Sequence, residues 1–158
     1  MVTVKNILVP TDFSDFSRHA LGYALTFAKT FGARIILMHV TPERELDAIR
    51  QVSPYFDPGK LEDFLQQRQS EDRKQLDEFI PSESKEGIEV ETIHKVGIPF
   101  VEIIRTAKEK KVDLIVMATH GRSGLAHVIF GSVAEKVVRK STSPVLSIRP
   151  PEHEFAMP

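Results

Sequence analysis

A carboxylate that follows the first apolar run of the chain is the first group that could do chemistry. Asp12 comes three positions after the apolar residues 7–9. A carboxylate in this place can accept hydrogen bonds from a ribose hydroxyl or from the amine of a base. Asp12, Ser14 or Asp15 could instead cap the helix expected next, because these side chains satisfy free backbone N–H groups. The residue types alone leave both roles open.

Glycine and serine recur beyond a later apolar run, in a pattern that suits a phosphate. Residues 117–124 read Met-Ala-Thr-His-Gly-Arg-Ser-Gly, and Gly131 with Ser132 opens a predicted helix. Backbone N–H groups in such a loop and at a helix N-terminus carry partial positive charge, so they can hold phosphate oxygens. The Ser132 hydroxyl adds a donor, and Arg122 adds a full charge. The alternative is a pair of ordinary glycine turns.

The sequence lacks the motifs of several other kinds of site. The Gly-Lys-Ser/Thr of the Walker loop and the Gly-x-Gly-x-x-Gly of the dinucleotide fingerprint do not occur. There is no Gly-x-Ser-x-Gly nucleophile elbow, and the six histidines show no short metal-binding spacing. His120 could contact a ribose or phosphate, or it could pack within a turn. We therefore assign no catalytic residue and no metal ligand.

Five runs of residues predict the strands that must position these groups. Four are short β-branched or aliphatic runs, at residues 7–9, 35–38, 114–117 and 145–148, and three of them are almost continuously apolar. Continuous apolar runs are typical of strands covered on both faces in a parallel sheet. Residues 88–92 alternate instead, which indicates a strand with one wetter face near a sheet edge. Ligands bind such sheets beyond the carboxyl ends of the strands.

Helical spacing of apolar residues predicts three helices that connect these strands. The first begins after a cap at Ser14 and ends at Gly32, the second begins near Pro99, and the third ends before Pro144. Strands that alternate with helices require right-handed crossovers, with helices on both faces of a parallel sheet. The predicted helices carry their apolar residues at 16, 20, 23, 24, 27 and 31, at 100, 103, 104 and 107, and at 133, 134, 137 and 138.

The stretch from Thr41 to about Pro81 is the least regular part of the sequence. Apolar residues at 61, 64 and 65 begin an amphipathic helix and those at 76, 79 and 80 end one, whereas residues 66–75 contain none. We expect a helix with a strongly solvated middle. A loop that carries Pro42, Pro54, Pro58 and Gly59 is expected before it. A surface excursion and a partner-binding flap both fit this pattern.

The composition fits one ordinary domain that can bury a sizeable core. The chain has 158 residues, of which 41% are hydrophobic and 27% are charged. The absence of cysteine excludes disulfides, zinc-thiolate sites and thiol nucleophiles. No run approaches the roughly 18 to 20 apolar residues of a membrane span. The start shows no signal peptide. We therefore expect a cytoplasmic protein without a membrane partner.

The net charge of −1 speaks against nucleic acid as a partner, since 21 Lys and Arg balance 22 Asp and Glu. The charge is unevenly distributed, however. Residues 41–90 hold 7 basic and 13 acidic residues, a net charge of −6. Residues 117–150 hold 5 basic and 1 acidic residue, a net charge of +4. The region of the predicted phosphate loop is therefore locally basic, as a small polyanion would require.

Taken together, these segments resemble the universal stress protein family. The likeness covers Thr3 to about Pro150 and rests on Ile7–Ser14, Leu37–Val40, Met117–Gly124 and Phe130–Val137 leading to Ser143–Leu146. It implies a single domain over residues 1–150, followed by a frayed tail over 151–158. The implied fold class is α/β, with an open twisted five-stranded parallel sheet of order 3-2-1-4-5 and helices on both faces. Such a fold is Rossmann-like and similar to that of the adenine nucleotide alpha hydrolases.

The ATP-binding branch of this family carries glycine, two residues, glycine, nine residues, glycine, then serine or threonine. Here Ala118 takes the place of the first glycine, while Gly121, Gly131 and Ser132 keep the spacing. Alanine disfavours positive φ, so the change matters only if position 118 needs that conformation or touches phosphate. The resemblance implies these nucleotide-binding residues: Pro10, Thr11, Asp12, Val40, Met117, Ala118, His120, Gly121, Arg122, Gly124, Gly131, Ser132 and Val133.

The function implied by the resemblance is binding of ATP, ADP or AMP in a stress-response or signalling role, with Mg²⁺ accompanying the phosphates. No base or water-positioning residue is evident, so an enzymatic activity is not assigned, although slow ATP hydrolysis is compatible with the sequence. The resemblance also implies a homodimer through the edge strand Val145–Ile148. One alternative is a dimeric scaffold of the same fold that does not bind nucleotide, suggested by Ala118. Another is a nucleotide-using transferase of a related α/β fold.

Overall fold

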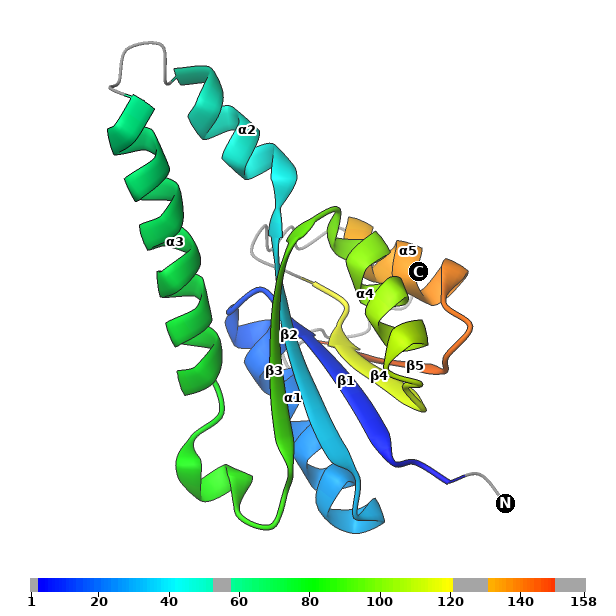
Figure 1. Cartoon of the computed structure of the whole chain (residues 1–158). Coiled ribbons are helices and arrows are strands. Elements are labelled where there is room, and N and C mark those ends of the chain that lie inside the picture. Colours follow the sequence, from blue (N-terminus) through cyan, green and yellow to red (C-terminus); the bar gives the residue numbers. More distant parts are fainter. Residues whose placement is uncertain (1–2, 53–57, 121–130, 150–158) are drawn as a thin grey trace, which may run out of the picture.

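A single parallel sheet organises the chain, for which a computed structural model describes residues 3–52, 58–120 and 131–149. Its five strands have the order β3-β2-β1-β4-β5 (Figure 1), which confirms the expected topology. All four neighbouring pairs are parallel. The strands are β1 (Asn6–Thr11), β2 (Arg34–Pro42), β3 (Val90–Gly97), β4 (Leu114–Ala118) and β5 (Val145–Ile148). The alternating strand β3 lies at one edge, as its pattern predicted.

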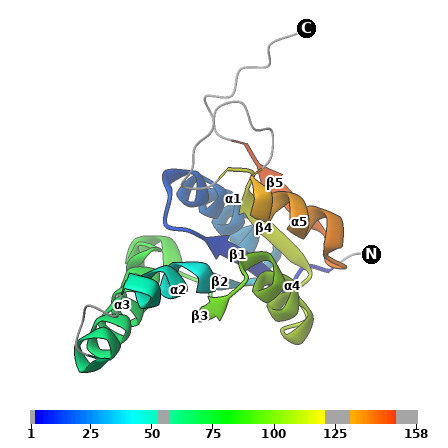
Figure 2. The ribbon, with the colours of Figure 1, turned by 90° about the horizontal axis from the view of Figure 1, so that it is seen from above.

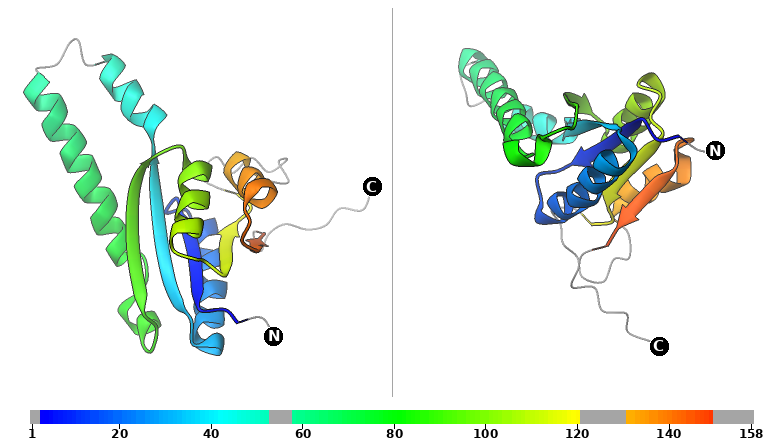
Figure 3. Two further views of the ribbon diagram at one scale, coloured as in Figure 1. Left: turned by 45° about the vertical axis from the view of Figure 1, so that its right-hand side comes forward. Right: turned by 90° about the horizontal axis from the view of Figure 1, so that it is seen from below.

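Helices cover both faces of the sheet. Seen from above, α1 and α4 lie on opposite sides of it (Figure 2). The helical elements are α1 (Asp15–Phe31), α2 (Glu43–Val52), α3 (Pro58–Glu78), the short 3₁₀ helix η2 (Ser82–Lys85), α4 (Pro99–Glu109) and α5 (Ser132–Lys140). Helix α2 and the first turns of α3 extend beyond the carboxyl ends of the strands (Figures 1 and 3).

The alternation of side chains along the central strands produces two apolar layers. On one face, Ile7 of β1 and Leu37 of β2 pack with Leu21 of α1 and Leu76 of α3. On the other face, the layer is formed by residues of β1, β2, β4, α4 and α5. Nearly all these side chains are fully buried, so the central strands are covered on both sides, as their continuous apolar runs predicted. The second layer comprises Leu8, Ile36, Met38, Val40, Ile103, Ala107, Val112, Ile115, Met117, Ala134 and Val137.

Local signals in the sequence fix the ends of the predicted helices. Ser14 caps α1, since its side chain accepts a hydrogen bond from the Ser17 N–H, and Gly32 ends the helix with a left-handed φ of 64°. Pro99 occupies the first turn of α4, where its missing N–H costs nothing. These boundaries were all readable from residue type.

The amino-terminal end of β1 is fastened to the start of β4. The Asp113 carboxylate accepts hydrogen bonds from the backbone N–H groups of Lys5 and Asn6, both at 2.9 Å. In return, the Asp113 N–H donates to the carbonyl of Asn6 at 2.9 Å. One side chain therefore joins segments more than 100 positions apart in the sequence.

The loop expected after the second strand is wrong at both of its described ends, because residues 43–52 form α2 and because Pro58 and Gly59 begin α3. Helix α2 follows β2 directly, with Glu43 and Glu45 in its first turn and Arg50 in its last turn, which suits the helix dipole. Its buried anchor is Leu46, which is 4% exposed. The proline-based expectation failed because Pro42 precedes the helix and does not interrupt it. The tail predicted over residues 151–158 lies outside the described residues.

Candidate functional site

A cavity of about 310 Å³ opens at the carboxyl ends of β1, β2 and β4. Parallel sheets of this kind bind ligands at that edge, where the strand order reverses between β1 and β4. Its walls include residues from the strand ends, from the first turn of α2, from α4 and from the start of α5. The cavity is lined by Pro10, Thr11, Asp12, Ser17, Met38, His39, Val40, Pro42, Arg44, Glu45, Pro99, Ile103, Met117, Ala118, Thr119, His120, Gly131, Ser132, Val133 and Ala134.

All of the predicted site residues within the described part of the chain line this cavity. Segments around positions 10, 40, 118 and 132 are far apart in the sequence, and the sheet brings them together. Three further predicted residues, Gly121, Arg122 and Gly124, lie outside the described residues. The ten predicted residues that line the cavity are Pro10, Thr11, Asp12, Val40, Met117, Ala118, His120, Gly131, Ser132 and Val133.

Hydrogen bonds make the turn between β1 and α1 compact. The Ser17 hydroxyl donates to the carbonyl of Ser14 at 2.8 Å, so the Thr11 hydroxyl, 2.9 Å away, donates its own proton to Ser17. Thr11 Oγ1 also accepts from the Phe13 N–H at 3.0 Å. Phe13 has a φ of 66°, which is unusual for a residue with a side chain. Its ring lies 4.2 Å from that of His39, measured between centroids, so packing holds the strained residue in place.

Asp12 lies in this turn and does not itself cap α1. Its Oδ1 accepts hydrogen bonds from the Ser14 N–H at 3.1 Å and from the Ser14 hydroxyl at 2.5 Å. Ser14 is the capping residue, with its Oγ 3.2 Å from the Ser17 N–H. Of the residues that could cap the helix, Ser14 therefore does so. Asp12 is braced by the cap and lines the cavity.

His39 joins the ends of β1 and β2 at the cavity wall. Its Nδ1 lies 2.8 Å from the carbonyl oxygen of Thr11, and a carbonyl can only accept, so Nδ1 carries the proton. The side chain is nearly buried, with the residue 6% exposed. This bond fixes the orientation of the imidazole ring that lines the cavity.

A backbone hydrogen bond connects the end of β4 to the start of α5 where both line the cavity. The Gly131 N–H donates to the carbonyl of Thr119 at 2.7 Å, and the Thr119 N–H donates to the carbonyl of Ile148 at 2.9 Å. His120 is buried, with Nδ1 2.8 Å from the Thr119 hydroxyl and its ring 6.2 Å from that of Phe16. His120 therefore combines a packed position with contact to the cavity.

The N-terminus of α5 supplies backbone donors to the cavity. Gly131 is the N-cap, with φ of −63° and ψ of 151°, and as a glycine it has no side chain with which to cap the helix. The first intrahelical bond runs from the Glu135 N–H to the carbonyl of Gly131. The N–H groups of Ser132 and Val133 precede that bond and belong to the first turn, which carries the positive end of the helix dipole. A helix end of this kind favours an anion.

Ala118 does not need the conformational freedom of glycine. It is the last residue of β4, pairs with Ile148 of β5, and is not among the described residues with positive φ. The change from glycine to alanine in the family motif therefore introduces no backbone strain at this position.

Sequence reasoning missed ten lining residues. Met38, His39 and Thr119 could have been found, because they neighbour predicted residues at strand ends. Arg44 and Glu45 could not, since α2 was expected to be a loop. The remaining missed residues are Ser17, Pro42, Pro99, Ile103 and Ala134. Among the described residues, no three acidic or histidine side chains are arranged to hold a metal ion. The described helices include none that is long and apolar enough to cross a membrane.

The fold and the cavity define a doubly wound α/β protein with a cavity at the carboxyl edge of its sheet, the place where proteins of this architecture bind small molecules. The sequence model of the Universal stress protein family matches residues 3–149. The chain therefore belongs to the universal stress protein family, as the resemblance of its motifs indicated.

Individual relatives match almost the whole chain. Universal stress protein MJ0577 from Methanocaldococcus jannaschii is 35% identical over 156 residues, which cover 94% of this chain and 96% of the relative. The solved structure of MJ0577 matches with a TM-score of 0.81 and 31% identity, covering 96% of this chain and all of that one. Universal stress protein YxiE from Bacillus subtilis is 35% identical over 150 residues, covering 92% of this chain and 99% of the relative.

Two more distant structures share the fold and contain adenine nucleotides. One is the universal stress protein from Archaeoglobus fulgidus in complex with dAMP, and the other is a universal stress protein in complex with cAMP. Each has a TM-score of 0.61 and 23% identity to this chain, and covers 93% of it and 98% of its own length.

Proposed function

We propose that the chain binds an adenine nucleotide, ATP or its ADP and AMP forms, in the cavity at the carboxyl ends of β1, β2 and β4. In this proposal it acts in the cytoplasm as a nucleotide-dependent stress-response or signalling protein. The observation that carries the proposal is the meeting of three features in one cavity of about 310 Å³: apolar walls, the Asp12 carboxylate and the N-terminus of α5.

The apolar part of the cavity suits a purine ring. Met38 and Val40 from β2 lie on the same side of the sheet as Met117 from β4, and all three are at least 90% buried. A flat base buried among such side chains gains from the removal of apolar surface from water. The backbone of Val40 would then bond the base edge, and Asp12 would accept from a ribose hydroxyl or the base amine.

The phosphates belong at the N-terminus of α5 in this arrangement. The N–H groups of Ser132 and Val133, with Gly131 as the cap, would donate to phosphate oxygens, and the Ser132 hydroxyl would add a third donor. The resemblance of the segment 117–124 to the family adds Gly121 and Arg122 as holders of ribose and phosphates, and Gly124 as a nucleotide-binding residue. Mg²⁺ would enter with the phosphates, whose oxygens are ligands that it prefers.

The alternative function is a dimeric scaffold of this fold without nucleotide. Its motivation was Ala118, but the extended backbone at that position removes the strain argument against binding. Dimerisation is compatible with either function. We propose a homodimer through β5, because this strand pairs only with β4 and its other edge is open within the described residues.

Calorimetric titration with ATP, ADP and AMP tests the proposal. We expect binding by the wild type and a loss of about tenfold or more in Gly131→Val, because a side chain would crowd the phosphate donors. Gly22→Val is the matched control, since a Cβ at Gly22 meets nothing within 4 Å and the residue lies outside the cavity. Absence of binding by the wild type at millimolar nucleotide would refute nucleotide binding and favour the scaffold.

A further inference from the structure

Residues 40–45, which we call the rim, form one part of the cavity wall. Along the rim, some side chains line the cavity and Thr41 points away from it. Val40 and Pro42 line the cavity, and Arg44 and Glu45 follow in the first turn of α2. Thr41 lies between them and does not line the cavity. Its side chain is turned toward α3, and the residue is only 2% exposed. Contacts that fix the position of Thr41 therefore also fix the position of its neighbours in the cavity wall.

Thr41 is held by a buried carboxylate of α3. The Thr41 hydroxyl donates to Asp72 Oδ2 at 2.8 Å, and Asp72 is 3% exposed. Arg68 Nε, one turn earlier on α3, lies 3.6 Å from Asp72 Oδ1. Because a buried carboxylate is costly without such partners, these contacts define where α3 sits against β2.

His94 of β3 completes the cluster. Its Nε2 lies 2.9 Å from Thr41 Oγ1 and 3.8 Å from Asp72 Oδ2. The Thr41 hydroxyl has one proton, which it gives to Asp72, so it accepts from His94 and Nε2 carries a proton. Neutral His94 is therefore the Nε2–H form, and any further proton must add at Nδ1.

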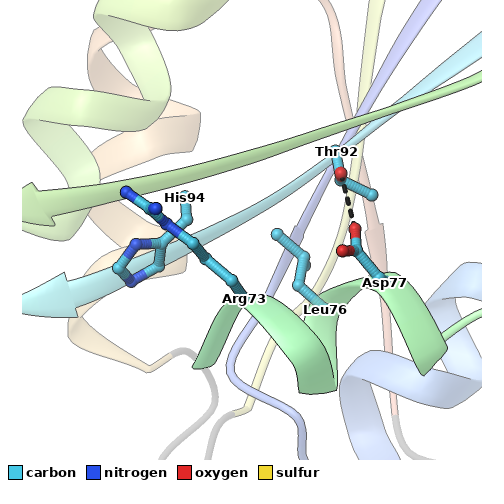
Figure 4. Close-up of a pocket in the computed structure, with 5 residues that line it drawn as sticks. All are labelled: Arg73, Leu76, Asp77, Thr92 and His94. Atoms are coloured by element: carbon cyan, nitrogen blue, oxygen red, sulfur yellow. Dashed lines mark hydrogen bonds between the residues drawn. The ribbon is translucent and has the colours of Figure 1, made fainter. Parts of the chain in front are cut away.

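His94 also lines a second cavity. This cavity measures about 170 Å³ and is lined by Arg73, Leu76, Asp77, Thr92 and His94. Figure 4 shows the Arg73 side chain extending alongside the His94 imidazole, while Thr92 donates to Asp77 Oδ1 at 2.8 Å on the other side. The His94 side chain is 5% exposed, and within the described residues its Nδ1 has no hydrogen-bond partner. A proton on Nδ1 would thus be placed near a guanidinium.

His94 also touches the wall of the first cavity. Its ring stacks on that of His39, with centroids 5.9 Å apart and planes 16° apart, and His39 lines the proposed nucleotide site. Burial lowers the pKa of His94, and His39 and Arg73 lower it further, while Asp72 opposes the shift. Displacing α3 would expose the ring and would remove both Arg73 and Asp72. Because burial is the largest cause of the lowered pKa, protonation of His94 favours displacement. The titratable and charged groups near His94 in the described residues are His39 from β2 and Asp72, Arg73 and Asp77 from α3, and Arg68 contacts Asp72 from the same helix.

We propose that Thr41, Asp72 and His94 form a latch, a set of positioning residues that fixes the nucleotide-cavity rim to α3 while His94 is neutral. Addition of a proton to His94 Nδ1 loosens α3, frees Thr41 and weakens nucleotide binding. The coupling rests on the proposed function, because it regulates that same cavity. Acidification below neutrality would therefore release nucleotide from this protein.

Titration calorimetry with ATP at about pH 7.5 and about pH 5.5 tests the coupling, for the wild type and for His94→Gln. Glutamine can still donate to Thr41 but cannot take up a proton. The terminal phosphate of ATP titrates equally in both proteins, so the ratio of their affinities isolates His94. We expect that ratio to change about threefold to tenfold between the two pH values. His19→Gln on α1 is the control and should follow the wild type.

Two further variants test the positioning role. Thr41→Val fills the same space without the hydroxyl and should weaken ATP binding at both pH values, whereas Thr41→Ser should restore it. Amide hydrogen exchange of residues 65–78 in the nucleotide-free protein gives a readout without nucleotide. At about pH 5.5 we expect faster exchange in the wild type than in His94→Gln, after correction for intrinsic rates.

The outcomes separate the two proposals. Equal affinity ratios at both pH values, or equal exchange of α3 in wild type and His94→Gln, would overturn the latch while nucleotide binding still stands. Absence of ATP binding at every pH would overturn the proposed function and the coupling together. The exchange of α3 would then still decide whether His94 controls its docking.

Discussion

Replacement of Ser14 by alanine should weaken both the first helix and the carboxylate that lines the cavity. The alanine removes the cap that accepts the Ser17 N–H and the 2.5 Å hydrogen bond that the hydroxyl donates to Asp12. Loss of a serine cap costs about 1 kcal/mol. Loss of a half-exposed hydrogen bond to a carboxylate adds about 1 kcal/mol. We therefore expect Ser14→Ala to lower the free energy of unfolding by about 2 kcal/mol.

Urea denaturation followed by circular dichroism measures this change in the nucleotide-free protein. For a domain of this size, about 2 kcal/mol corresponds to a fall in Tm of about 4 to 8 °C. Ser14→Thr keeps the hydroxyl and should stay close to the wild type. Ser70→Ala is the matched control, because Ser70 is exposed in the middle of α3 and alanine is the better helix former. Equal urea midpoints for Ser14→Ala and Ser70→Ala would refute the capping argument.

The same substitution connects stability to the proposed function. Residue 14 donates two hydrogen bonds to Asp12 in the wild type, one from its backbone N–H and one from its hydroxyl. In Ser14→Ala only the bond from the backbone N–H is left. The carboxylate then loses part of its orientation toward the cavity. We expect ATP affinity to fall several-fold in Ser14→Ala and to be retained in Ser14→Thr. Unchanged affinity in the alanine variant would show that the cap does not position Asp12.

Three other predictions concern the packing of α3, the pH dependence of stability and the oligomeric state. Leu76→Ala should cost about 2 to 5 kcal/mol in urea unfolding, whereas Phe64→Ala, at a side chain 51% exposed, should cost less than about 0.5 kcal/mol. Because the folded pKa of His94 is lowered, its contribution to stability is complete above its unfolded pKa of about 6.5 and is lost as the pH falls. If the urea midpoint fell with decreasing pH as much in His94→Gln as in the wild type, this prediction would be contradicted. Light scattering at micromolar concentration should give the mass of a dimer, and a monomer mass would exclude pairing through Val145–Ile148.

The sequence predicted the sheet well because burial on both faces leaves a strong pattern. Continuous apolar runs placed the central strands, and the alternating run placed β3 at the edge. Ser14 and Gly32 placed the ends of α1 because each residue type has a specific geometric role at a helix end. Glycines and a carboxylate at the strand ends then indicated the cavity, since parallel topology brings these ends together.

The region from α2 to α3 was harder to predict because its anchors are few or polar. Helix α2 is held by little more than Leu46, which is too weak an apolar pattern to distinguish from a loop. Helix α3 continues through residues 66–75 without an apolar side chain, because Asp72 is the residue that it buries there. Hydrophobic periodicity cannot identify a helix face whose buried contact is a carboxylate with partners on two strands.

The strand order has a consequence for how the chain is made. β1 lies between β2 and β4, and Ile7 pairs with Leu114, so one edge of the first strand waits for a partner encoded more than 100 residues later. At a synthesis rate of about 5 to 20 residues per second, the interval between the completion of β2 and the appearance of β4 is about 4 to 14 seconds. The apolar strand stays open during that time, which exposes it to pairing with other chains. A ribosome-stalled chain that ends before Asp113 should therefore depend on chaperones to stay unaggregated, whereas one that includes β4 should not.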